Sequence, residues 1–159
     1  MRSHQIFAGM SPEHSHTFLR ALSEEQPGLF AQALAAASAA LKSRPVYLTR
    51  QPFEKQADAV RRALSRVAAS PVAEEILAAY FLECRKELLA EWLDALGIEH
   101  EEGVLKEDPT PPDPATLEKA VATFRAAGDE PDRELLLRAF AAQSAVEWPK
   151  LEDLIGEHG

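Results

Sequence analysis

Residues 71–96 have the sequence PVAEEILAAYFLECRKELLAEWLDAL, and this stretch decides the fold. It contains no glycine and no proline after Pro71, and it is rich in leucine, alanine and glutamate, which favour helix. Gly97 follows directly, at the place where a left-handed residue commonly ends a helix. We therefore expect one long helix over residues 71–96.

Apolar residues cover about half of the circumference of this helix when successive residues are placed about 100° apart. These residues are Leu77, Phe81, Leu82, Cys84, Leu88, Leu89, Trp92, Leu93 and Leu96. An arc of this width exceeds a single packing stripe, so the helix should contact several neighbours at once. The expected fold is all-α: a single-domain globular bundle of six to seven helices around a long central helix.

Shorter helices are expected on both sides of the central one. Ser11-Pro12 and Asp113-Pro114 each combine a capping side chain with a first-turn proline. Helically spaced apolar residues predict further helices over 27–42, 52–69, 114–127 and from 131 onward, the helix over 52–69 carrying Val67 in its apolar stripe. Between them we expect an extended connector at 44–48, a hairpin or irregular turn at 98–105 and a proline-rich connector at about 106–114.

The part of the chain after the proline-rich connector is too short to form a robust core alone. We therefore expect residues 1–159 to form one helical domain, in which a possible C-terminal helical subdomain, residues 113–159, packs on the rest.

Cysteine content and hydropathy indicate the cellular compartment of the protein. Cys84 is the only cysteine, so an internal disulfide and a cysteine-rich zinc site are both excluded, a pattern typical of a reducing compartment. The first ten residues lack a continuous apolar signal segment, and no run approaches the roughly 20 apolar residues of a membrane span. We expect a soluble cytoplasmic protein with no membrane association.

The net charge of −9 is unevenly distributed. Residues 1–70 hold nine Lys/Arg and five Asp/Glu, a balance of +4, whereas residues 71–159 hold eight and 21, a balance of −13. An acidic half repels phosphate backbones, so nucleic-acid binding is not expected. The surplus either serves solubility or forms a docking surface for a basic protein partner.

Arg85 is the most unusual residue of the central segment, because it lies inside the apolar arc near Leu88 and Trp92. A charge there must extend to solvent, pair with an acid or meet a ligand. Two interpretations stay open: a structural ion pair, and an anion-binding residue in an interhelical pocket lined by Arg85 and Trp92.

The opposite side of the expected helix carries Tyr80, Glu83, Glu87, Glu91 and Asp94. It is either an ordinary solvated surface or an acidic strip that faces a partner. Its carboxylates point away from the predicted core, which argues against a metal site.

Few other residues suggest chemistry. Nucleotide-binding, zincin and hydrolase motifs are absent from the sequence. Glu13 and His16 form one Glu-x-x-His pair, but a di-iron bundle needs two. His100 lies among glutamates in an expected turn. We predict no metal, no cofactor and no catalytic residue.

A basic stripe is formed by Lys55, Arg62 and Arg66, with Arg61 beside it, on the helix expected over 52–69. It could meet phosphates, but it lacks the interleaved aromatic residues of nucleic-acid interfaces. A solvated or salt-paired face is the simpler interpretation.

These observations lead to three functional hypotheses. The first is a non-enzymatic protein-interaction or regulatory module with an acidic contact surface. The second is a small-molecule binder or enzyme with a pocket for an anionic ligand around Arg85. The third is an inhibitor or immunity-type protein that masks a basic enzyme. The sequence does not specify a partner or an oligomeric state.

Overall fold

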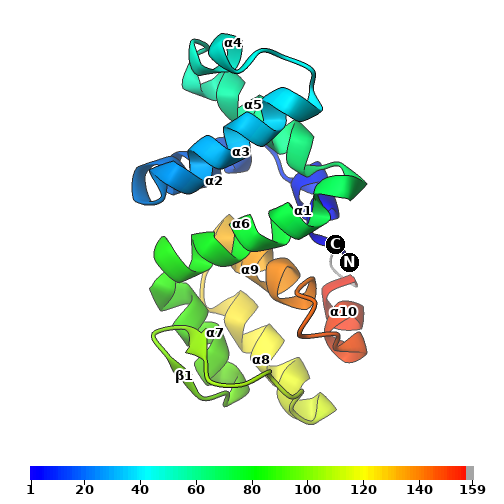
Figure 1. Ribbon diagram of the computed structural model, residues 1–159. Helices are drawn as coiled ribbons and strands as arrows, with labels where there is room; N and C mark the ends of the chain where they lie inside the picture. Colours follow the sequence, from blue (N-terminus) through cyan, green and yellow to red (C-terminus); the bar gives the residue numbers. More distant parts are fainter. Residues whose placement is uncertain (157–159) are drawn as a thin grey trace. The chain divides into compact units, whose positions relative to one another are not determined.

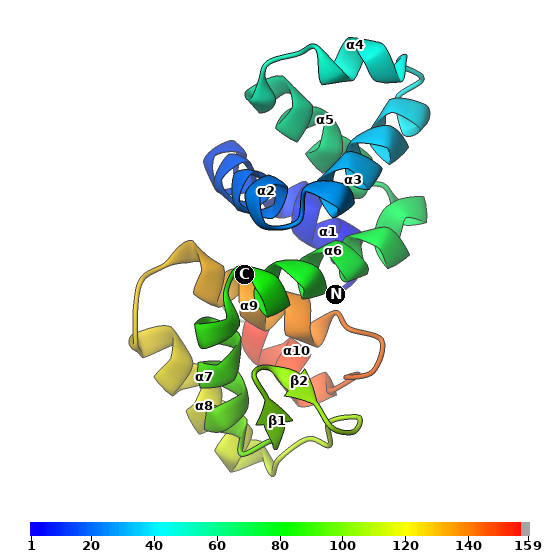
Figure 2. The same ribbon diagram turned by 60° about the vertical axis from the view of Figure 1, so that its left-hand side comes forward.

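The computed structural model describes residues 1–156, and within this range the protein is almost entirely α-helical, as predicted. The chain divides into two compact units: Arg2–Cys84, and Met1 together with the chain from Arg85 onward. Figures 1 and 2 label the elements of both units.

The first unit contains α1 to α6 and one short 3-10 helix. Their bounds are Ser3–Gly9 (α1), Pro12–Glu25 (α2), Pro27–Ala40 (α3), Pro45–Thr49 (α4), Phe53–Leu64 (α5), Val67–Ala69 (the 3-10 helix) and Ser70–Glu83 (α6). Helices α2, α3 and α5 pack against one another, and α4 covers one end of the α3–α5 pair (Figure 1).

The core of the first unit is a row of aromatic rings from α1, α2 and α6. Phe18 lies 5.7 Å from Phe7 and 4.1 Å from Tyr80 between ring centroids, and Tyr80 lies 5.0 Å from Phe81. All four side chains are buried. Because α1 supplies Ile6 and Phe7 to this core, the N-terminal segment is a structural helix, which the sequence did not predict.

The second unit contains four helices and one hairpin. Their bounds are Lys86–Leu96 (α7), His100–Glu101 (β1), Val104–Leu105 (β2), Pro114–Ala126 (α8), Pro131–Ala141 (α9) and Pro149–Gly156 (α10). Trp92 on α7 is fully buried against Phe124 of α8 and Phe140 of α9, with centroid distances of 5.4 and 5.8 Å. Figure 2 shows the two strands beside the C-terminal end of α7.

The predicted long helix over 71–96 is wrong in one respect: it is interrupted. The backbone of Arg85 (φ −136°, ψ 49°) leaves the helical region, so α6 ends at Glu83 and α7 begins at Lys86. The predicted enclosure is confirmed for Phe81, Leu88 and Trp92, which are all buried. With this division and the unpredicted α1 and α4, ten α-helices lie within residues 1–156, rather than six to seven.

Of three local predictions, two are wrong and one is confirmed. Residues 44–48 are not an extended connector, because Arg44 alone is extended (ψ 136°) and helix α4 begins directly after it. Val67 is 62% exposed instead of joining an apolar stripe, because α5 ends at Leu64. The hairpin alternative at 98–105 is confirmed. Its two turn residues, Glu102 and Gly103, both have positive φ, as a two-residue type I′ turn requires.

Candidate functional site

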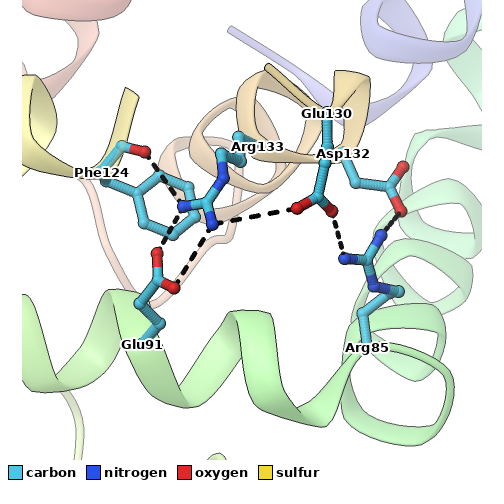
Figure 3. A network of polar contacts seen from close by, with 6 residues as sticks. All are labelled: Arg85, Glu91, Phe124, Glu130, Asp132 and Arg133. Atoms are coloured by element: carbon cyan, nitrogen blue, oxygen red, sulfur yellow. Dashed lines mark hydrogen bonds and ion pairs between the residues drawn. The ribbon is translucent and has the colours of Figure 1, made fainter. Parts of the chain in front are cut away.

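Two of the predicted site residues, Arg85 directly before α7 and Glu91 on it, belong to a network of ion pairs with the start of α9. One Arg85 amino group donates to Asp132 Oδ2 and the other to Glu130 Oε2, both at 2.6 Å. Figure 3 shows that the chain of charges continues through Arg133, which reaches Glu130 and Glu91. Of the two interpretations of Arg85, the geometry matches the structural ion pair.

Arg133 is the most enclosed charge of this network. It is 7% exposed, donates to the carbonyl oxygen of Phe124 at 3.0 Å and lies over the Phe124 ring at 4.8 Å (Figure 3). Its hydrogen bond with Glu91 raises the pKa of the guanidinium further. Gly128 leaves room for it, because a Cβ there would lie 2.8 Å from Arg133 Nε.

The predicted acidic strip is not one helix face. Tyr80 does not belong to it, since its side chain is 3% exposed and packs against Phe18. Glu91 is bound by Arg133 through both carboxylate oxygens. Glu83 and Glu87 are exposed, but they lie on different helices, α6 and α7, because the helix is interrupted between them.

An acidic groove lies instead after the end of α7. It has a volume of about 340 Å³ and is formed by residues 96–99 and 106–112, where the proline-rich connector runs past the end of the helix. Its carboxylates are Glu99, Glu107 and Asp108, all exposed, and Lys106 is the one cation among these lining residues. Leu96, Ile98 and three prolines supply its apolar lining.

Local hydrogen bonds hold the backbone that forms the groove. Gly97 adopts φ 71°, and the amides of Gly97 and Ile98 donate to the carbonyls of Asp94 and Leu93, which is the expected Schellman ending of α7. The N–H of Gly103 donates to His100 Nδ1 at 3.1 Å. This places the ring proton of His100 on Nε2, which lies 2.8 Å from Asp94 Oδ1. His100 thus holds the hairpin to α7.

Charge around the groove is not balanced locally. Six carboxylates and one lysine lie between residues 94 and 108. The second unit has other cations, but Arg85, Arg125 and Arg133 are bound by Glu130, Asp132, Glu134 and Glu91. These three arginines therefore serve the packing of α7, α8 and α9.

The histidine of the Glu-x-x-His pair has a carboxylate beside it. His16 lies 2.8 Å from Asp58, and no group of three or more His, Cys, Asp or Glu side chains within residues 1–156 is placed to hold a metal ion. No helix in the same range is long and apolar enough to cross a membrane.

The fold and the groove define an all-α protein with an acidic concave surface in its second unit. No protein-family model matches the chain, and comparisons with curated proteins and with solved structures return no match. Function must therefore be inferred from the surface chemistry of this chain.

Proposed function

We propose that this protein is a non-enzymatic, cytoplasmic protein-interaction module that holds a lysine- and arginine-rich segment of a partner protein in the acidic groove. One observation carries the proposal. The groove combines exposed Glu99, Glu107 and Asp108 with apolar lining residues, while the three arginines of the second unit that form ion pairs are bound elsewhere.

The carboxylates and the apolar residues that line the groove together suit long cationic side chains. Lysine and arginine lay their methylene stems on apolar surface and keep the charged group in water or against a carboxylate. In this groove the stems of a partner would lie on Ile98 and the prolines, and the charged groups would meet the carboxylates. The surplus of negative charge would also accelerate encounter with a basic partner.

The test is the affinity of a fluorescent lysine- and arginine-rich peptide, measured by anisotropy near physiological salt. Reversing all three charges, Glu99→Lys, Glu107→Lys and Asp108→Lys, should weaken binding at least about tenfold. This follows because three exposed ion pairs at about 0.5 kcal/mol each amount to about 1.5 kcal/mol.

A matched control reverses three exposed carboxylates of the same unit that do not line the groove. The triple variant Glu87→Lys, Glu118→Lys and Asp153→Lys changes the net charge equally. It also includes Glu87, from the predicted helical strip. Equal weakening by both triple variants would show that net charge alone attracts the peptide and would contradict a site in the groove.

A further inference from the structure

A second groove, in the first unit, has the opposite charge. Its volume is about 630 Å³, and it lies where the end of α3, the short helix α4 and one face of α5 meet. Lys42, Lys55, Arg62 and Arg66 line it, with Asp58 as the one carboxylate among the described lining residues. Three of these cations are the basic stripe of the sequence, so the stripe faces a concavity.

The cations reach the groove from separate segments. Lys55 and Arg62 are seven residues apart on α5 and therefore share a face. Arg66 follows the end of α5, and its Nη1 donates to the carbonyl oxygen of Ala40 at 2.7 Å, which anchors the guanidinium at the end of α3. Lys42 is held after α3 by a backbone with φ 56°.

The positive charge of this groove is only partly neutralised. Asp58 is engaged by His16, at 2.8 Å between Nε2 and Oδ1. Lys42, Lys55 and Arg62 form no ion pair with any residue of the described chain, 1–156. Like charges gathered in a concavity repel one another, and a multivalent anion relieves that repulsion.

The ligand class follows from charge, size and lining. A phosphate monoester carries nearly two negative charges at neutral pH, and its oxygens accept the paired N–H groups of arginine. The volume lies in the range of about 300–1,000 Å³ that small ligands occupy. Tyr47, 59% exposed, is the one aromatic residue among the described lining residues, whereas single-stranded nucleic acid binds on several successive aromatic residues.

We infer that this basic groove binds the phosphate monoester group of a small molecule, with Lys42, Lys55 and Arg62 as its charged contacts. The site is separate from the acidic groove, and it would give the protein a small-molecule ligand in addition to a protein partner.

The experiment follows backbone amide shifts of the full-length protein by NMR at low ionic strength. The probes are ribose 5-phosphate, inorganic phosphate and uncharged ribose. Ribose 5-phosphate should shift the amides of residues 40–66 saturably and bind at least about tenfold more tightly than ribose. A tenfold difference corresponds to about one hydrogen bond to a charged group.

The variant Lys55→Ala with Arg62→Ala should weaken ribose 5-phosphate about tenfold or more. The control Arg44→Ala with Arg50→Ala removes two exposed cations of the same region that do not line the groove, and should change affinity less than about twofold. Far-UV circular dichroism and thermal melting verify that both variants fold.

Several results would overturn the inference. These are equal binding of ribose and ribose 5-phosphate, and equal loss of affinity in both double variants. Tighter binding of a phosphoserine peptide or a single-stranded oligonucleotide at the same amides would assign the groove to a macromolecule instead. A dimer that dissociates on addition of phosphate would assign it to a second copy of this chain.

Discussion

Arg85 and Arg133 show how charge is used at the level of single residues. Each guanidinium joins α7 to the start of α9, and the two are linked through Glu130 (Figure 3). A cation that is enclosed against an aromatic ring needs bound acceptors, because desolvation of an unpaired charge is costly. The network gives the two terminal amino groups of Arg133 Glu91 and a backbone carbonyl as acceptors, while its buried Nε has no hydrogen-bond partner among the described residues.

Replacement of Arg133 by methionine should destabilise the second unit by about 1.5–3 kcal/mol, because charge-assisted hydrogen bonds are lost while the methionine retains most of the packing on Phe124. Urea unfolding followed by tryptophan fluorescence measures this change. Arg138→Met, on the same helix but outside the network, should cost no more than about 0.5 kcal/mol. Equal effects of the two substitutions would show that the network contributes nothing specific.

The sequence identified Arg85 as unusual but could not identify its partners. Glu130 and Asp132 lie 45 and 47 positions away, and helical spacing relates only neighbouring turns. Tyr80 was misplaced for a related reason. Helical periodicity assigned one buried side to the helix, whereas α6 packs against both α1 and α2 and buries more of its circumference.

At the level of elements, the ends of helices follow local sequence closely. Ser11 and Asp113 accept hydrogen bonds from the amides of His14 and Thr116, and Gly97 ends α7, all as predicted. These features are local, so the sequence suffices. The interruption at Cys84–Arg85 has no glycine or proline, so local propensity does not predict it; Arg85, the residue at the break, forms tertiary ion pairs with Glu130 and Asp132.

The cap of α8 should make its N-terminus sensitive to acid. Hydrogen bonds from the Thr116 side chain, and then from its amide, hold the pKa of Asp113 below the ordinary value of 3.8. A depressed folded-state pKa means that the stabilisation is fully present above the unfolded-state pKa and is lost as the pH falls through the lower folded-state value.

An NMR titration of the Asp113 carboxyl carbon should therefore give a pKa below 3.8, and Thr116→Val should move it upward. Thr123→Val, on the same helix but two turns away, should leave the Asp113 titration unchanged. An unshifted Asp113 in the unmodified protein would contradict the capping geometry.

At the level of the whole molecule, the division into two units can be tested with the natural probes. Both tryptophans, Trp92 and Trp148, lie in the second unit, while helices of both units contribute to far-UV circular dichroism. If the units unfold separately, the tryptophan transition in urea should not coincide with the circular dichroism transition. Coincident transitions would support the single domain that we expected from the sequence.

Matched core substitutions provide a second test of whether the two units unfold separately. Leu22 and Leu117 are both fully buried, one in each unit, and each leucine-to-alanine change should cost about 2–5 kcal/mol. Leu117→Ala should lower the urea midpoint seen by tryptophan, whereas Leu22→Ala should leave that midpoint unchanged and alter only the circular dichroism curve. A shift of the tryptophan midpoint in Leu22→Ala would indicate one cooperative unit.

The position of the proline-rich connector has a practical consequence for dividing this chain into fragments. Residues 106–112 resemble an interdomain linker in composition, yet they join the hairpin to α8 inside the second unit, and α8 packs on α7. A cut there would separate two helices that share the Trp92–Phe124 contact. A cut between Cys84 and Arg85 passes through no helix. Fragments of this chain are therefore better divided at Cys84–Arg85 than at the proline-rich connector, although composition alone suggests the connector.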